Sequence, residues 1–450
     1  MIHKSYIYFM EIIKTETNYK RKLYFSTSNA KSKKYNEKLE NQIINIYPQV
    51  KYQEIIGFGG AITEATALSL FSLPENKQSD FFNEYFSENG ANYSLCRLPI
   101  GSSDFSEKSY SYSNKPDLSD FSIEKDKEYI IPFIKKAQKI NPNLKLLASP
   151  WSPPKFMKSN KMLILGGKLL EKYKTTWANY LVKYIKSYEN ENIKIDYITI
   201  QNEPNATQIW ESCLYSANEE KDFATNYLFP LFKEHNIKTK ILIWDHNKEK
   251  LFTRASEELS DNNSLNAISG IAFHWYTGDH FENISLTKEF FPSKLLIHTE
   301  GCTGYSKFNP NDEEKNAEIY GNDILGDLNA GINGYIDWNM CLNYNGGPNH
   351  KNNFCNSPIM VNSDYTNYIK NLSFYYIKHF SHFIKPNARK IGFSKYTDNI
   401  KVTAFENPNS SIAIILFNKN NFNNEYNLVI NNEVIHDNLD SHAIVSYLIK

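Results

Sequence analysis

The chain has 450 residues, and its 50 Lys+Arg balance its 50 Asp+Glu, so the formal net charge at pH 7 is zero. This balance gives no electrostatic indication of a protein that binds nucleic acid, an anionic membrane or a polyanionic substrate. The length exceeds that of one small domain and suffices for a large barrel with a companion domain.

The cysteines and the N-terminal segment bear on the cellular compartment. Five cysteines are spread along the chain without a C-x-x-C pair, so they indicate neither a disulfide framework nor a zinc knuckle. The N-terminal segment lacks the continuous apolar region of a signal peptide, because Glu11 and Lys14 interrupt it. No segment approaches the roughly 20 apolar residues that span a bilayer. We therefore expect a cytoplasmic protein without stable membrane insertion.

The first 50 residues predict short β-strands. Apolar and polar residues alternate, turn residues separate the runs, and helical periodicity is absent. The predicted strands cover residues 5–13, 20–27 and 41–47.

From residue 51 to 385, apolar strands alternate with helical segments. Their β-branched, continuously apolar character is typical of parallel strands buried on both faces. The predicted strands cover residues 55–63, 93–101, 145–151, 196–203, 240–246, 270–276, 294–300 and 334–340. Apolar residues recur every three to four positions in 167–191 and 364–384, which predicts two amphipathic helices.

Eight strands, each followed by a helical stretch, predict an α/β fold, the (β/α)8 TIM barrel. A doubly wound open sheet is the competing architecture, but GFGG at 57–60 does not fit the G-x-G-x-x-G turn of such folds. Short strands return at 390–396, 401–407, 411–418, 425–431 and 443–450. We expect residues 1–50 and 386–450 to meet in an accessory antiparallel β-sandwich beside a barrel of residues 51–385.

Two glutamates stand at the ends of predicted barrel strands. Glu203 ends the fourth strand and is followed by Pro204, whereas Glu300 ends the seventh. A single glutamate there is most simply a solvated strand end or an ion-pair partner. Active sites of such barrels lie at the carboxyl ends of the strands, where both glutamates would meet. Two carboxylates at one rim are what glycoside hydrolysis requires.

Several longer segments share one family's order of motifs. They are GFGGAITEATA (57–67), RLPIGSSDFS (97–106), LLASPWSPPKFMKSN (146–160), QNEP (201–204), GIAFHWY (270–276), HTEG (298–301), DWNMCLNYNGGPNHKNNF (337–354) and SPIMV (357–361). With these segments the chain resembles the glucosylceramidase-type enzymes of glycoside hydrolase family 30, in a bacterial-like form. The resemblance covers the whole barrel and agrees with a sandwich built from both termini.

The resemblance implies a retaining mechanism. Glu203 would be the acid/base, with a raised pKa, and Glu300 the nucleophile, about 5–5.5 Å away. Asn202 would hold the sugar 2-hydroxyl, the alternative being a helix cap. Arg97 would orient and ionise the nucleophile, the alternative being a structural ion pair. Tyr276 would contact the nucleophile.

The remaining site residues are also implied by matching motifs. Asp104 and Trp151 would bind the outer hydroxyls of the sugar, and Trp338 would form the apolar floor, the alternative for Trp338 being core packing. His274 would contact the pocket, and Asn353 would supply a polar contact from the loop after the last barrel strand.

No cofactor and no metal are expected. His246, His274 and His298 end separate strands and form neither an HxH nor an HExxH pattern, so we expect hydrogen bonding rather than zinc binding.

The expected activity is hydrolysis of a terminal β-linked glucose from a carbohydrate or glycolipid substrate. The same mechanism on another sugar, as β-xylosidase, β-fucosidase or β-1,6-glucanase, stays open, as does a non-catalytic sugar-binding barrel. Trp210 and His350 depart from the animal lysosomal enzymes, which leaves the leaving group open between ceramide, another lipid and a sugar.

Overall fold

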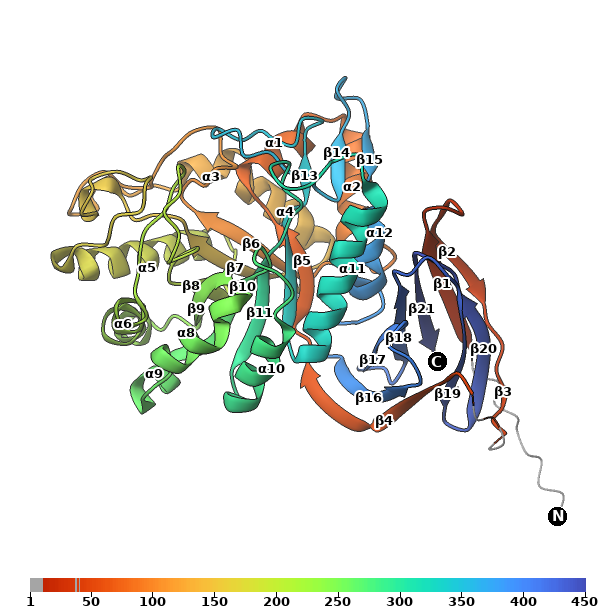
Figure 1. Cartoon of the computed structure of the whole chain (residues 1–450). Helices are drawn as coiled ribbons and strands as arrows, with labels where there is room; N and C mark the ends of the chain where they lie inside the picture. The colour runs from red at the N-terminus through yellow and green to blue at the C-terminus, as the bar shows by residue number, and fades with distance from the viewer. Residues whose placement is uncertain (1–10, 37–38, 40) are drawn as a thin grey trace, which may run out of the picture.

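Eight parallel strands close into a barrel in the computed structural model, which describes residues 11–36, 39 and 41–450 (Figure 1). The strands follow one another around the barrel in chain order, as a TIM barrel requires. They are β5 (Gly57–Ala61), β6 (Leu95–Ile100), β7 (Lys145–Pro150), β8 (Tyr197–Thr199), β9 (Lys240–Asn247), β10 (Ile268–His274), β11 (Leu295–Glu300) and β12 (Gly334–Asn339). All eight coincide with predicted strands, which confirms the barrel.

Helices surround the barrel and cover the outer faces of its strands (Figure 1). They are α1 (Glu64–Phe71), α2 (Glu75–Phe86), α3 (Glu124–Glu128), α4 (Ile130–Ile140), α5 (Lys174–Asn190), α6 (Ala217–Asp222), α7 (Phe229–Glu234), α8 (Leu251–Glu258), α9 (Asn262–Ala267), α10 (Phe281–Phe290), α11 (Glu313–Ala330) and α12 (Leu372–Ser381). Shorter turns are η1 (Lys155–Met157), η2 (Glu171–Tyr173), the π-helical η3 (Phe223–Leu228) and η4 (Lys248–Lys250). Within the described residues, no helix combines the length and apolarity needed to cross a membrane.

The predicted helix over 167–191 is largely confirmed. In α5 the apolar stripe is buried, with Trp177 and Tyr184 fully enclosed. The helix begins later than predicted, at Lys174, because Leu170 has an extended backbone and Glu171–Tyr173 form a 3-10 turn.

The predicted helix over 364–384 is wrong in its first half. Instead, Tyr368–Lys370 form strand β15, which pairs antiparallel with β14 (Ile359–Val361). Strand β14 in turn lies parallel to β13 (Cys341–Leu342). Ile369, counted in the apolar stripe, is 54% exposed. The helical spacing there is coincidental, and pairing with β14 determines the local structure.

The second unit is a β-sandwich formed from both ends of the chain (Figure 1). Its sheet has the strand order β2-β1-β21-β18-β17-β16-β4-β19-β20-β3. The strands are β1 (Ile12–Asn18), β2 (Leu23–Asn29), β3 (Lys33–Lys34), β4 (Ile43–Glu54), β16 (Arg389–Lys395), β17 (Lys401–Glu406), β18 (Ile412–Asn418), β19 (Asn424–Ile430), β20 (Glu433–Leu439) and β21 (Ala443–Ile449). The sheet folds over itself, since the hydroxyls of Tyr426 in β19 and Tyr447 in β21 lie 2.6 Å apart.

The sandwich differs from the sequence prediction in one strand pairing and in two strands that were not predicted, β3 and β20. The pairing of β4 with β19 is parallel, whereas the other strand pairs of this sheet are antiparallel in the described residues. Strand β20 was not predicted; it follows a two-residue turn in which Asn431 and Asn432 have φ angles of 50° and 63°, the conformation of a type I′ hairpin. Residues 5–10 of the strand predicted at 5–13 lie outside the described residues.

A buried histidine joins the barrel to the sandwich. His379 lies in α12, the last helix of the barrel, and is fully buried. Its Nδ1 lies 2.8 Å from Ser446 Oγ in β21, and its Nε2 lies 2.9 Å from Thr17 Oγ1 in β1. The helix therefore contacts strands from both ends of the chain, which ties the two units together.

The GFGG segment serves the close packing of the first barrel strands. A Cβ atom at Gly59 would lie 1.6 Å from the carbonyl oxygen of Leu95. No side chain fits at such a distance, so the glycine is required for β5 to lie against β6.

We expect Gly59→Ala to lower the free energy of unfolding by about 1–3 kcal/mol or more, because β5 and β6 must separate. Chemical denaturation of the purified variant measures this effect. Gly304→Ala is the control, since a Cβ there would meet no atom closer than Ser306 Oγ at 3.9 Å. Equal stability of the two variants would contradict the close-packing argument.

Candidate active site

A cavity of about 320 Å³ opens at the carboxyl ends of the barrel strands. Its lining includes eight of the predicted site residues: Asp104, Trp151, Asn202, Glu203, Tyr276, Glu300, Trp338 and Asn353. Arg97 and His274 are fully buried and lie behind this lining. The structure thus brings all ten predicted side chains to one place.

Glu300, the last residue of β11, is held at both carboxylate oxygens. Arg97 Nη1 donates to Oε2 at 2.5 Å, and the Tyr276 hydroxyl donates to Oε1 at 2.8 Å. Such bonds leave the carboxylate little freedom to rotate, so one face of it stays directed at the cavity.

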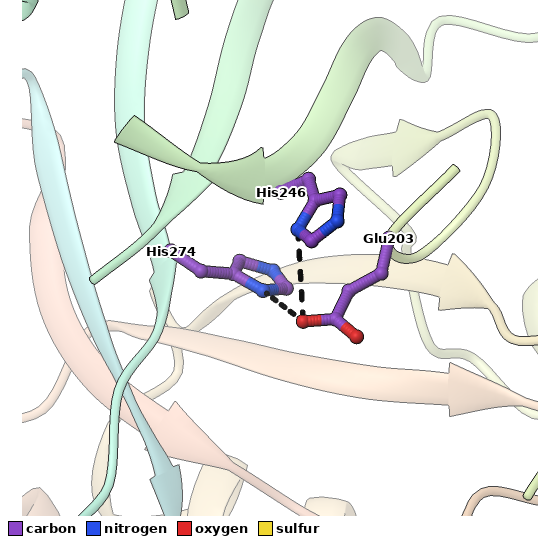
Figure 2. Close-up of side chains that lie close together, drawn as sticks. All are labelled: Glu203, His246 and His274. Atoms are coloured by element: carbon purple, nitrogen blue, oxygen red, sulfur yellow. Dashed lines mark hydrogen bonds and ion pairs between the residues drawn. The ribbon is translucent and has the colours of Figure 1, made fainter. Parts of the chain in front are cut away.

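Glu203 follows β8 in a left-handed backbone conformation, with a φ of 49°. Its amide N–H donates to the carbonyl of Asp245 at 2.9 Å, which holds the turn. Its Oε1 lies 3.3 Å from His274 Nδ1 and 3.7 Å from His246 Nδ1 (Figure 2). Gln208 Nε2 donates to Oε2 at 3.3 Å.

The surroundings of Glu203 and His274 shift their pKa values in opposite directions, which favours the proton on the histidine. Burial raises the pKa of Glu203, but the hydrogen bond from His274 and the nearby positive charge outweigh it and lower the pKa below its ordinary value. Burial lowers the pKa of His274, but the charge of Glu300 and the bonds to Asp245 and Glu203 raise it to about 9. The lowered pKa of Glu203 is opposite in direction to the raised pKa that the family resemblance implies, and it favours an imidazolium–carboxylate pair.

Asp245 is a central residue that the sequence analysis did not single out. Its side chain is fully buried and accepts hydrogen bonds from Arg97 Nη2 at 2.8 Å and Thr299 Oγ1 at 2.6 Å. Its Oδ1 also lies 3.1 Å from His274 Nε2. Burial raises the pKa of Asp245, but the Arg97 guanidinium and His274 hold it well below its usual range. Asp245 therefore links the partner of Glu300 to the partner of Glu203.

A bulge in β9 directs Asp245 into the barrel. Trp244 and Asp245 have φ angles of 73° and 47°, and the register with β10 shifts beside them. Non-glycine residues in this conformation are strained, and such strain concentrates at functional sites. The sequence indicated Asp245 only through its position, as an acidic residue near the carboxyl end of the fifth predicted strand, in IWDH (243–246).

Another part of the cavity lining is aromatic and amide-rich. Trp151 and Trp338 stack with ring centroids 5.4 Å apart. Asp104 accepts hydrogen bonds from Asn353 Nδ2 at 3.0 Å and from Asn349 Nδ2 at 3.1 Å. Burial raises the pKa of Asp104 to about 7, against the lowering effect of these two bonds. Asn349 was not predicted, although it lies in the same matching segment as Asn353.

Three further residues weighed from the sequence take different places. His298 is buried outside the cavity lining, with Nδ1 2.7 Å from Asp327 Oδ2, so it enters hydrogen bonding as expected. Trp210 lines the cavity. His350 lies outside the lining, with Nδ1 3.0 Å from the carbonyl oxygen of Ser106.

The side chain of Asn202 is also held in place. Its Oδ1 accepts a hydrogen bond from Arg97 Nη2 at 2.8 Å, which orients its amide group.

We expect Asp245→Asn to lower the pKa of His274, because the imidazolium loses a buried carboxylate partner. The free energy of unfolding should fall by about 3–5 kcal/mol, the cost of breaking a buried ion pair from one side. Titration of the His274 ring by NMR and chemical denaturation measure the two effects. Asp126→Asn, at a buried carboxylate bonded to Tyr112 and Tyr188, is the control and should leave His274 unchanged. An unaltered His274 pKa in Asp245→Asn would contradict the linkage.

Comparison with known proteins identifies the family. The family model "Glycosyl hydrolase family 30 TIM-barrel domain" matches residues 55–384, and "Glycosyl hydrolase family 30 beta sandwich domain" matches residues 387–447. The chain is 34% identical over 394 residues to "Putative glucosylceramidase 4" of Caenorhabditis elegans, covering 82% of this chain and 75% of that protein.

Two solved structures are similar over nearly the whole chain. SrfJ from Salmonella typhimurium has a TM-score of 0.95 and 32% identity, covering 98% of this chain and 99% of that one. The endo-beta1,6-glucanase BT3312 has a TM-score of 0.89 and 27% identity, covering 97% and 99%. On these matches and the geometry above, the chain belongs to glycoside hydrolase family 30 and is a retaining β-glycosidase.

Proposed function

We propose that this glycosidase releases a terminal β-linked glucose from a glucosylceramide-type substrate, with Glu300 as nucleophile and Glu203 as acid/base. The observation that carries the proposal is the pair of carboxylates in one cavity, Glu300 held by Arg97 and Tyr276, and Glu203 held by His274. The glucosylceramidase name of the relative in Caenorhabditis elegans supports the choice of substrate.

In the first step, Glu300 attacks the anomeric carbon and the glycosidic oxygen leaves with a proton. That proton comes from the His274–Glu203 pair, passing from Nδ1 to Oε1 across the 3.3 Å contact and then to the leaving oxygen. Ester formation removes the charge of Glu300, the largest single influence that favours the imidazolium. In the second step Glu203, again a carboxylate, takes a proton from the attacking water.

Trp151, Trp338 and Asp104 would form the sugar-binding end of the cavity. Aromatic faces suit the C–H surfaces of a pyranose. Asp104, directed by Asn349 and Asn353, would accept hydrogen bonds from the outer hydroxyls, and Asn202 would contact the 2-hydroxyl.

A β-1,6-glucanase activity is the second candidate. It is supported by the similarity to the endo-beta1,6-glucanase BT3312, at a TM-score of 0.89 and 27% identity. Both candidates share the two carboxylates and differ in what binds beyond the cleaved bond.

We expect Glu300→Ala to reduce kcat by several orders of magnitude and azide to restore part of the activity, giving an α-glycosyl azide. Glu203→Ala should be impaired least with activated aryl leaving groups, which need little protonation. With azide it should give a β-glycosyl azide, since the covalent intermediate still forms. Product analysis by NMR distinguishes the two anomers, and the same anomer from both variants would contradict the assignment.

A substrate panel tests the sugar and the leaving group: aryl β-glucoside, β-xyloside, β-fucoside and β-galactoside, glucosylceramide and β-1,6-linked gluco-oligosaccharides. We expect the glucoside to be preferred and glucosylceramide to be cleaved. Asp104→Ala should lower kcat/KM for the glucoside about 10- to 100-fold, because it removes a buried hydrogen-bonding group for the outer hydroxyls. Asp117→Ala, at an exposed loop position, is the control. Preference for the gluco-oligosaccharides with glucosylceramide uncleaved would favour the glucanase.

A further inference from the structure

Three side chains from successive strands converge on one point beside the cavity. Glu203 follows β8, His246 lies in β9 and His274 ends β10. Figure 2 shows both imidazole rings directing a nitrogen at the same carboxylate oxygen of Glu203. One ligand atom from each residue lies within 4.8 Å of the other two. This is a set of two histidines and one carboxylate, the ligand types that zinc and related transition metals prefer.

The spacing of the ligand atoms fits a tetrahedral ion. Ligands at about 2.0–2.1 Å from a tetrahedral metal lie about 3.3 Å from one another. Glu203 Oε1 is 3.3 Å from His274 Nδ1 and 3.7 Å from His246 Nδ1. Small side-chain movements therefore suffice to bring the three atoms into coordination.

The surroundings also orient these ligands. His274 Nε2 lies 3.1 Å from the buried carboxylate of Asp245, which leaves Nδ1 to face Glu203. A carboxylate behind a histidine is the usual outer support of a metal ligand. His246 Nδ1 is buried and makes no hydrogen bond within the described part of the chain. An unsatisfied buried nitrogen is costly, and a metal ion would satisfy it.

In a second cluster with metal-binding residue types, a lysine already balances the negative charge of the carboxylates. His298, Asp323 and Asp327 are also close together, but Lys248 Nζ lies 2.6 Å from a carboxylate oxygen of each aspartate. The ammonium group supplies the positive charge that a metal would bring. The cluster at Glu203 has no lysine or arginine contact among the described residues, and it borders the cavity, which leaves the fourth coordination position open to water.

We propose that Glu203, His246 and His274 bind a divalent transition-metal ion, such as Zn²⁺, and that the bound ion inhibits the enzyme. The ion replaces the proton between His274 Nδ1 and Glu203 Oε1, and that proton passes to solvent. Glu203 then has no proton to donate, and the positive charge of the ion makes its carboxylate a weaker base. Binding of the metal does not depend on the proposed function, whereas inhibition rests on the role of Glu203.

Direct binding to the full chain tests the proposal. Calorimetric titration with Zn²⁺ and the visible absorption of Co²⁺ report binding without any substrate. We expect one Zn²⁺ per chain, a tetrahedral Co²⁺ spectrum and loss of aryl glycoside hydrolysis over the same metal concentrations. Mg²⁺, which prefers oxygen ligands, should neither bind there nor inhibit.

Two variants and two controls locate the ion. His246→Asn and the isosteric Glu203→Gln should each raise the Zn²⁺ dissociation constant at least about tenfold, and thermal unfolding verifies that both are folded. His280→Asn, which replaces a partly exposed histidine beside Glu282, should bind Zn²⁺ normally. Cys302→Ser should too, although its thiol lies 3.5 Å from the Tyr276 hydroxyl in the same cavity.

The outcomes separate the alternatives. Absence of saturable Zn²⁺ binding would overturn the proposal, as would loss of binding in Cys302→Ser with normal binding in His246→Asn. Stoichiometric binding at the three residues without inhibition would support the site and instead count against Glu203 as acid/base.

Discussion

The active site depends on a buried chain of alternating charges that runs from one catalytic carboxylate candidate to the other. Glu300 is bound by Arg97, Arg97 by Asp245, Asp245 by His274 and His274 by Glu203. Each charge is stabilised by its neighbours and by hydrogen bonds from polar side chains, because burial removes the solvation that an isolated charge would need. The five groups come from five different strands or strand ends, so the register of the barrel must hold for any of them to be satisfied.

This requirement explains local features that would otherwise be unfavourable. Glu203, Trp244 and Asp245 all have left-handed backbone angles, and the amide of Glu203 donates to the carbonyl of Asp245. The strained backbone directs the carboxylate of Glu203 into the cavity and the carboxylate of Asp245 beneath it. Energetic support comes from the bonds that Asp245 makes with Arg97, Thr299 and His274. The strained residues and the charge chain therefore stabilise one arrangement together.

The sequence predicts those parts of the molecule that depend on local pattern. The barrel strands were identified because buried parallel strands are continuously apolar, and the ten site residues because they end those strands or match family motifs. Asp245 was missed because a bulge, which a period-two pattern does not reveal, turns it inward. The ionisation of Glu203 depends on His274, 71 residues later. The helix predicted over 364–384 failed because Ile369 follows the spacing of a helix but pairs as a strand.

In the proposed function, the chemistry and the recognition of the sugar depend on different parts of the fold. The charge chain lies on strands and their ends, whose positions the closed barrel determines. The proposed sugar-binding residues depend instead on loops, since Asn349 and Asn353 both direct the carboxylate of Asp104 and follow β13 in an irregular segment. Changes in that loop would alter which hydroxyls are bound without moving Glu203 or Glu300. Such a division explains how similar proteins can have names with different substrates, such as a glucosylceramidase and an endo-beta1,6-glucanase.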